Sequence, residues 1–358
     1  MSAVVVTGAA GFVGQRVLRR LADRDVPVVA VDAVPIGEGG YIDRRLVDLA
    51  RDSHERLLPA MAGAGSVLHL AWSHSDPGHG SPGAFFPNLV ALRRVLEAAA
   101  RSGVGRVLHV SSATVYGAWP DNPVPLAEDA PLRPNPGFAY AVEKAEAERV
   151  VAEWADEHPE VVVTILRPTV TVGSSGPALY QALAGTNAPQ PEDSARPMQF
   201  LDVEDLAGAI VFAWEHRLSG VFNVAPDGWI THEQARAIVG GMARLRLPRR
   251  LAGAVASAGW KLLRTGTPAQ ARAYSVHPWV VANDRLRAEG WVPERSNEEA
   301  LVSSDNRSHW SDLPPSRRQE MALTAAGLGV LAVVGGAVGG AVAVVSRARR
   351  GRHRRRRG

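Results

Sequence analysis

The sequence predicts an α/β protein with a doubly wound parallel sheet, and two observations carry this prediction. Short apolar runs of strand length alternate with segments of helical periodicity through the first half of the chain, and a glycine-rich turn follows the first run. This alternation is typical of right-handed βαβ crossovers in one sheet. The expected strands lie at about residues 2–6, 27–32, 66–70, 106–110 and 161–166, and the expected helices at about 12–23, 88–102 and 139–157.

The composition of the 358 residues supports a packed core and narrows the chemistry. Hydrophobic residues make up 46% and charged residues 21% of the chain, which argues against disorder. Eight arginines and no acid occur in residues 346–358, so the formal net charge of +4 becomes −4 over residues 1–345. We therefore expect no nucleic-acid partner. The absence of cysteine excludes disulfides, thiolate catalysis and cysteine-bound metals.

The first strand ends at a turn that opens the first helix. Residues 2–6 are apolar, lack a basic residue and stop at Gly8, which is typical of a buried parallel strand rather than a secretory signal. Within TGAAGFVG (residues 7–14), Gly8 permits the tight turn and Gly11 lets the backbone approach a pyrophosphate. Gly14 allows close packing of helix on strand, and the helix N-terminus favours the negative charge.

The acid at the end of the second strand indicates which dinucleotide binds there. Asp32 would accept hydrogen bonds from the adenosine ribose hydroxyls and repel a 2′-phosphate, and residues 33–35 (AVP) supply no base for such a phosphate. NAD is therefore favoured over NADP. The simpler alternative is a glycine turn followed by a surface aspartate.

A candidate catalytic pair lies on the third expected helix. Tyr140 and Lys144 are four residues apart and share one helix face, and an ammonium near a phenol favours the phenolate. Such a Tyr suits acid/base work on a substrate hydroxyl during hydride transfer. Lys144 is one of only two lysines among 40 basic residues. The hydroxyls of Ser111 and Ser112 follow the strand at 106–110, at the edge where ligands bind in such sheets.

These elements together resemble the extended short-chain dehydrogenase/reductase family, in its NAD-dependent epimerase/dehydratase branch, over about residues 3–300. The resemblance implies a Rossmann fold with NAD as cofactor. It gives Ser112 the role of orienting the reacting oxygen and Tyr140 that of the acid/base. Lys144 would lower the Tyr pKa and bind the nicotinamide ribose.

The same resemblance extends the expected cofactor site along the chain. It assigns the adenine to Asp48 and Leu49, and the nicotinamide side to the segment ending at Pro168. Residues 200–206 resemble the segment that returns to the first domain, and residues 222–224 the short strand after it. The full set of expected cofactor-binding residues is Gly8, Gly11, Phe12, Val13, Gly14, Asp32, Asp48, Leu49, Leu70, Ala71, Asn88, Ser111, Tyr140, Lys144 and Pro168.

Several positions depart from the family pattern. Ala113 and Thr114 stand where dehydratases carry an Asp-Glu pair, which disfavours dehydration of a sugar. Glu143 replaces a small hydroxyl residue and is expected to point to solvent; the alternative is that it perturbs Tyr140. The segment between Pro168 and Phe200 is short and lacks the Asn and the Arg placement typical of nucleotide-sugar enzymes, which disfavours a standard UDP-sugar epimerase.

The second lobe is rich in tryptophan, at positions 214, 229, 260, 279 and 291. That composition suits a less polar substrate, although a core built from tryptophan is the simpler interpretation. His69, His74 and His79 recur at intervals of five, but only Asp76 joins them, so no metal is expected. The family resemblance implies that the helices at 88–102 and 139–157 form the face of a homodimer.

The C-terminal region predicts an association with membrane lipid. Residues 303–320 are polar and read as a linker, and residues 321–346 contain no charge. As a helix, residues 322–345 would span about 36 Å, against roughly 30 Å of bilayer core. The Arg-rich residues 347–358 suit anionic headgroups. The alternative is a disordered low-complexity tail.

The expected organisation follows from these features. Residues 1–168 form the NAD-binding domain, to which 200–225 return, and residues 169–302 form an irregular substrate lobe. One spanning helix cannot place both the Arg tail and an NAD-dependent domain in the cytoplasm. Either the segment is a re-entrant or surface anchor, or one of the two rules fails. We expect a catalytic domain held on the cytoplasmic side of a membrane through the C-terminal hydrophobic helix.

Two functions remain open from the sequence. The first is an NAD-dependent oxidoreductase or epimerase that takes hydride from a secondary alcohol of a small sugar-type or lipid-like substrate. The second is a non-catalytic, membrane-anchored NAD-binding scaffold or sensor, which would have no need of Ser112, Tyr140 and Lys144 together.

Overall fold

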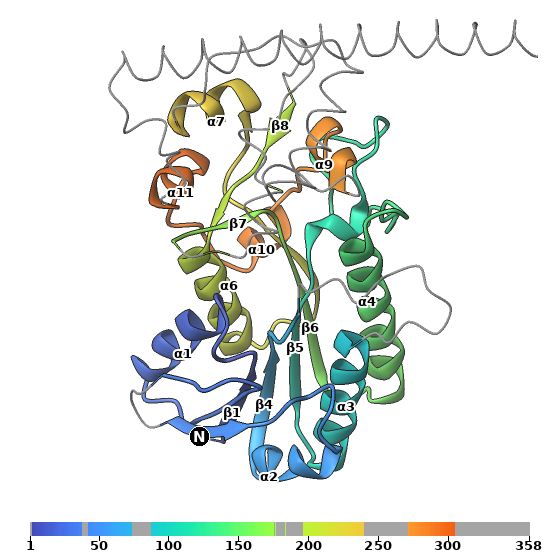
Figure 1. The fold of residues 1–358 in the computed structure, drawn as a ribbon, viewed down its shortest axis with the longest axis vertical. Helices are drawn as coiled ribbons and strands as arrows, with labels where there is room; N and C mark the ends of the chain where they lie inside the picture. Colours follow the sequence, from blue (N-terminus) through green and yellow to red (C-terminus); the bar gives the residue numbers. More distant parts are fainter. Residues whose placement is uncertain are drawn as a thin grey trace, which may run out of the picture. The chain divides into compact units, whose positions relative to one another are not determined.

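The computed structural model describes residues 2–37, 42–73, 87–174, 176, 183, 196–239 and 271–304. Its centre is a seven-stranded sheet in the order β10-β6-β5-β4-β1-β2-β3, in which every pair of neighbours is parallel (Figure 1). The strands are β1 Ala3–Thr7, β2 Val28–Asp32, β3 Ile42–Leu46, β4 Ala64–His69, β5 Arg106–Val110, β6 Val162–Pro168 and β10 Gly220–Val224. The structure confirms the predicted Rossmann-like sheet.

One edge strand escaped the sequence analysis. Strand β3 has the sequence IDRRL, and four of its five residues are exposed. An edge strand has one solvated side and carries charged residues there, so it lacks the apolar run by which the buried strands were found.

Helices cover both faces of the sheet, because its strands alternate their side chains between two cores. Val4 and Val6 of β1 pack with α1 (Gly14–Ala22) and α6 (Val203–Glu215). Val5 of the same strand packs on the opposite face with α3 (Pro87–Arg101) and α4 (Ala139–Glu157). The short α2 (Leu58–Met61) lies under this second face.

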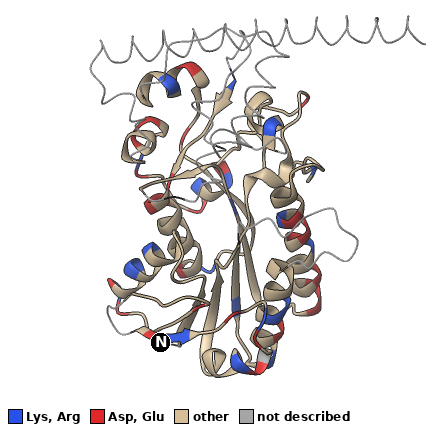
Figure 2. Ribbon diagram, viewed as in Figure 1, with Lys and Arg blue, Asp and Glu red and all other residues tan. Residues whose placement is uncertain are grey.

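The predicted helices at 12–23, 88–102 and 139–157 are thus present, with α1 beginning two residues later than expected. Acidic and basic side chains are interspersed along α3 and α4 (Figure 2). The homodimer expected through these two helices stays a prediction.

The second lobe has its own buried cluster above the carboxyl ends of the strands (Figure 1). Phe138, Phe200 and Tyr274 are among its large members. The lobe consists of short elements: η2 Ala113–Tyr116, β7 Thr171–Val172, β8 Pro197–Met198, β9 Leu201–Asp202, β11 Ile230–Thr231, α7 His232–Val239, α9 Arg272–Val276, α10 Asp284–Ala288 and α11 Asn297–Ser303.

Two of the described tryptophans of this region lie in hydrophobic cores, Trp279 in that of the lobe and Trp291 in that of the sheet. Trp279 and Trp291 are buried, Trp214 is partly buried against the sheet core, and Trp229 is 45% exposed. Trp260 lies outside the described residues. The simpler interpretation, a core built from tryptophan, therefore fits Trp279 and Trp291.

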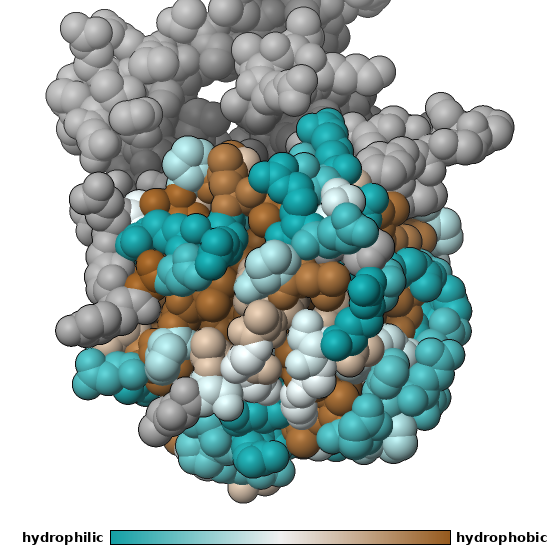
Figure 3. Space-filling view, turned by 90° about the horizontal axis from the view of Figure 1, so that it is seen from below, coloured by the Kyte–Doolittle hydropathy of each residue, from teal (hydrophilic) through white to brown (hydrophobic). Residues whose placement is uncertain are grey.

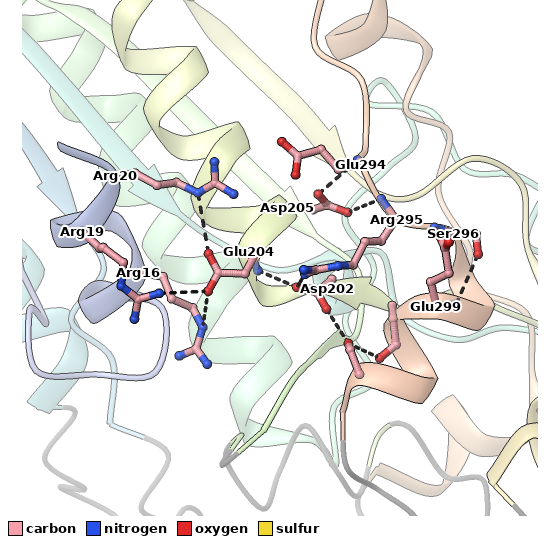
Figure 4. A network of polar contacts seen from close by, with 12 residues as sticks. Arg16, Arg19, Arg20, Asp202, Glu204, Asp205, Glu294, Arg295, Ser296 and Glu299 are labelled. Atoms are coloured by element: carbon pink, nitrogen blue, oxygen red, sulfur yellow. Dashed lines mark hydrogen bonds and ion pairs between the residues drawn. The ribbon is translucent and has the colours of Figure 1, made fainter. Parts of the chain in front are cut away.

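A polar network ties the first helix to α6 and to the end of the second lobe (Figure 4). Glu204, at the start of α6, forms ion pairs with Arg16, Arg19 and Arg20 of α1, at distances of 3.2–3.8 Å. The adjacent Asp202 caps α6 by accepting a hydrogen bond from the Glu204 backbone N–H and pairs with the Arg295 guanidinium at 2.5 Å. The segment that returns from the lobe is thereby tied to α1, the helix that follows the glycine turn.

A second network is buried beneath the carboxyl ends of β5 and β6. The Arg167 guanidinium donates to both carboxylate oxygens of Glu148, at 2.6–3.1 Å, and both side chains are buried. Arg167 also donates to the Tyr116 hydroxyl at 2.7 Å, and Tyr116 donates to Asn223 at 2.8 Å. Ser111 donates its hydroxyl proton to Glu148 at 2.5 Å. Glu148 therefore links α4 to two strands.

The predicted C-terminal membrane segment, residues 321–346, and the Arg-rich tail lie outside the described residues, as do residues 305–320 of the predicted linker. Among the helices that the structure describes, none is long and apolar enough to cross a membrane. The hydrophobic helix therefore stays a prediction.

Seen from the α2 end, hydrophobic residues reach the surface between hydrophilic ones (Figure 3).

We predict that Glu148→Ala lowers the free energy of unfolding by about 3–5 kcal/mol, because it leaves the Arg167 charge buried without its partner. Urea unfolding followed by circular dichroism measures this change. The matched control is Glu153→Ala, which removes an exposed partner of Arg149 on the same helix and should change stability by no more than about 0.5 kcal/mol. Equal effects of the two substitutions would show that the buried pair does not stabilise the fold.

Candidate active site

A cavity of about 450 Å³ opens at the carboxyl ends of the central strands. It is lined by residues that end or follow β1, β2, β4, β5 and β6. Its volume falls within the ordinary range for ligand pockets, and its place is the one at which open parallel sheets bind ligands. Fourteen of the fifteen predicted cofactor residues line it: Gly8, Gly11, Phe12, Val13, Gly14, Asp32, Asp48, Leu49, Leu70, Ala71, Asn88, Ser111, Lys144 and Pro168.

The glycine turn tolerates no side chain at two of its three glycines. A Cβ at Gly14 would lie 2.1 Å from the Gly8 carbonyl oxygen. Gly8 has a φ of +72°, and a Cβ there would lie 2.6 Å from the Ala71 nitrogen. The α1 helix that follows has no side-chain cap and no acid in its first turn. The positive end of the α1 dipole therefore meets no carboxylate of its own first turn, which favours an anion such as a pyrophosphate at the glycine turn.

Asp32 lines the cavity and also braces the glycine turn. One carboxylate oxygen accepts a hydrogen bond from the Ala10 backbone N–H at 2.9 Å, and the other accepts one from Val34 at 3.2 Å. Since an ionised carboxylate can accept about four hydrogen bonds, sites remain for the two hydroxyls of a ribose. The residues beyond it in the lining, Ala33 and Val34, carry no positive charge.

The opposite wall is fixed by Asn88 at the start of α3. Its side-chain amide accepts a hydrogen bond from the Ser73 N–H at 2.8 Å and donates to the Ser73 carbonyl at 3.0 Å. It also donates to the Glu143 carboxylate at 3.0 Å. The expectation that Glu143 points to solvent is wrong: only 5% of this residue is exposed, because its position on α4 turns it toward α3 and the Asn88 amide.

Lys144 lies at the base of the cavity. Its Nζ donates to the Val110 carbonyl at 2.8 Å and stands 3.5 Å from the centre of the Trp72 ring. Burial lowers the pKa of Lys144 to about 7, against the opposing effect of the Glu143 and Glu148 carboxylates. This ammonium is therefore poised to lose or keep its proton near neutral pH.

Tyr140 and Ser112 do not line the cavity but lie close to residues that do. The Tyr140 ring meets the Trp72 ring edge to face, with centroids 6.4 Å apart. The Ser112 hydroxyl accepts hydrogen bonds from the backbone N–H and the hydroxyl of Thr114, at 3.2 and 3.0 Å. Tyr140 and Lys144 share α4, one turn apart, as predicted.

Two buried histidines lie under this corner. The rings of His69 and His109 stack with centroids 5.6 Å apart, and His69 Nδ1 shares a hydrogen bond with the Thr7 hydroxyl at 2.7 Å. Burial, followed by the charge of Lys144, lowers the pKa of His69 to about 3 and that of His109 well below its ordinary value. Both rings are therefore neutral. His74 and His79 lie outside the described residues.

Sequence reasoning missed Trp72 and Ser73, which also line the cavity. They directly follow the expected segment at residues 69–71, so the rule that ligands gather beyond strand ends could have included them.

The family model described as "NAD dependent epimerase/dehydratase family" matches residues 4–225. The chain belongs to this family. A UDP-glucose 4-epimerase of Azospirillum brasilense is 29% identical over 84% of this chain and 90% of its own length. A 3-diazoavenalumate denitrifying reductase of Streptomyces sp is 32% identical over 81% and 95%. The UDP-glucose 4-epimerase of Thermus thermophilus, solved in complex with NAD, has a TM-score of 0.64 at 20% identity, covering 85% of this chain and 98% of that one.

As a member of the epimerase/dehydratase family, the protein is an NAD-dependent enzyme of the extended short-chain type. The residues of the cavity fit this cofactor. The glycine turn leaves room for the pyrophosphate, Asp32 offers acceptors to the adenosine ribose, and Lys144 lines the same cavity. When bound, NAD supplies a reversible acceptor for hydride.

We predict that Asp32→Asn weakens NAD binding about 10- to 100-fold, because a charged hydrogen-bond acceptor worth roughly 1.5–3 kcal/mol is lost. The ratio of NAD affinity to NADP affinity should also fall, since the repulsion between Asp32 and the 2′-phosphate of NADP disappears. Isothermal titration calorimetry with both dinucleotides measures this. Asp43→Asn, an exposed change on the neighbouring strand β3, is the control. An unaltered preference in Asp32→Asn would remove Asp32 from ribose recognition.

Proposed function

We propose that the protein is an NAD-dependent epimerase that acts on a sugar nucleotide. The observation that carries this proposal is the placement of Lys144, buried on the helix of Tyr140 and lining the dinucleotide cavity. In this mechanism the Tyr140 phenolate takes the proton of a secondary hydroxyl while hydride leaves the same carbon. The Lys144 ammonium stabilises the phenolate, and Ser112 holds the reacting oxygen.

The reverse steps complete an epimerisation. Once the carbon is a planar ketone, it can present its other face to the hydride, and Tyr140 returns the proton to the oxygen. The cofactor is regenerated in each cycle, so no net oxidation occurs. The Azospirillum brasilense relative, named a UDP-glucose 4-epimerase, supports this cycle for the present chain.

A buried guanidinium in the second lobe favours an anionic substrate. Arg196 is 7% exposed and donates to the Tyr274 carbonyl at 2.5 Å, while Nε and Nη2 have no acceptor among the described residues. Burial lowers the pKa of Arg196 to about 10. Tyr274 in turn donates to the Thr114 carbonyl at 2.7 Å, two residues from Ser112. Among the described residues no carboxylate forms an ion pair with Arg196, and a buried cation in that setting favours a ligand that carries negative charge, such as a diphosphate.

A net reductase is the second candidate, favoured by the similarity to the Streptomyces reductase. It would use the same Tyr140 and Lys144 but release an oxidised cofactor. The two candidates differ in the cofactor balance, so one assay separates them.

The test supplies the full chain with NAD and either UDP-glucose or UDP-galactose, and products are separated by chromatography. We expect interconversion of the two sugars without net NADH, and loss of at least about 1,000-fold in kcat for Tyr140→Phe with NAD affinity within about twofold. Glucose and galactose, which lack the diphosphate, should not react. Oxidation of NADH with a keto or diazo substrate would favour the reductase, and NAD binding without turnover of any substrate would favour the scaffold.

We further propose that residues 321–346 and the Arg-rich residues 347–358 hold the catalytic domain at the cytoplasmic face of a membrane. The uncharged composition of the first segment and the arginines of the second support this. The full chain should float with vesicles that contain phosphatidylserine, and a chain ending at residue 320 should not. A full chain that stays at the bottom of the gradient with both anionic and neutral vesicles would exclude the anchor.

A further inference from the structure

Trp72 occupies the corner where both catalytic side chains of α4 meet the sheet. It follows β4 by three residues and lines the dinucleotide cavity. Its ring centre lies 3.5 Å from Lys144 Nζ, and its ring also meets Tyr140 edge to face at 6.4 Å. One indole therefore contacts the proposed base and the lysine that serves it.

The contact with Trp72 matters because Lys144 has few other partners among the described residues. A buried ammonium needs partners for three N–H groups, and the structure provides one hydrogen bond, to the Val110 carbonyl. Among the described residues, no carboxylate forms an ion pair with Nζ. Besides the Val110 carbonyl, the described residues place the indole face of Trp72 against Nζ, and a cation this close to a Trp face in a desolvated site is strongly attracted.

We propose that Trp72 is a positioning residue for the reaction, which holds the Lys144 ammonium over its indole face and keeps it protonated beside Tyr140. The inference rests on the proposed function for its catalytic meaning. The cation–π interaction itself, which stabilises the charged form of Lys144, can be measured without any substrate.

Other charged or titratable groups also face Lys144 and contribute to its pKa. Glu143 and Glu148 on α4 favour the ammonium, and His69 on β4 and His109 on β5 lie beneath it as neutral rings. Tyr140 lies one turn before it on the helix. Since burial lowers the pKa of Lys144 to about 7, a loss of cation–π attraction would shift the lysine further toward its neutral form near neutral pH.

The chain itself offers a sharp readout, because Lys144 and Lys261 are its only lysines. Full-length protein labelled with 13C at lysine Cε gives two NMR signals, which the Lys261→Arg variant assigns. We expect the Hε protons of Lys144 to be shifted upfield by the Trp72 ring. Titration of the Cε shift then gives the pKa of each lysine in one sample, with Lys261 as the internal reference.

Trp72 is then replaced, by nonsense suppression, with mono-, di- and tetrafluorinated tryptophan. These side chains keep the shape of the indole but withdraw electron density from its face. The pKa of Lys144 should fall stepwise along the series, by about one unit in total, while that of Lys261 stays fixed. The same residues placed at Trp279, which packs against Tyr274 in the second lobe, should leave the pKa of Lys144 unchanged.

The outcomes separate this inference from the proposed function. A stepwise fall with fluorination supports the cation–π interaction whether or not a substrate has been found. A pKa of Lys144 that stays flat across the series, or an unshifted Hε signal, overturns it even if epimerase activity is present. Where turnover is measurable, the pH limb of kcat/KM assigned to the ammonium should move with the same steps.

Discussion

The buried pair of Glu148 and Arg167 is the interaction on which the rest of the site depends. It joins the middle of α4 to the end of β6, and through Ser111 it reaches the end of β5. Tyr140 and Lys144 project from the same helix, so the register of their side chains against the sheet is set where the pair anchors α4. A buried pair contributes little net stability compared with an apolar substitute, but a half-broken one is strongly unfavourable. The arrangement therefore favours specificity of position over gain in stability.

Much of the fold could be read from the sequence because parallel strands buried on both faces leave continuous apolar runs. The glycine turn, Asp32 and the Tyr140–Lys144 pair were found because each depends on local spacing. What escaped is what depends on tertiary packing. Strand β3 has an exposed edge, Glu143 is buried by a partner 55 residues earlier, and Trp72 acquires its role only when α4 folds over β4 and β5. No local pattern encodes contacts of this kind.

The second lobe illustrates another limit of the sequence. The Arg expected for a nucleotide sugar was missing from its usual place, which disfavoured such a substrate. The structure buries Arg196 at the entry to β8, one side chain away from the Ser112 turn through Tyr274. Arg196 therefore supplies a positive charge to this lobe from a position that the sequence pattern of the family does not indicate. Other polar residues of the lobe are also buried, among them Gln199 and Asn297, but Arg196 is the one of these three that carries a charge.

Asp32 accepts hydrogen bonds from the backbone on both sides, at Ala10 in the glycine turn and at Val34 beyond the strand. The residue that would choose the dinucleotide is thus also a brace of the turn that receives its phosphates. An arginine at this position would leave both N–H groups without their acceptor. A substitution of Asp32 that changed the choice of dinucleotide would therefore also remove a brace of the turn that receives the phosphates.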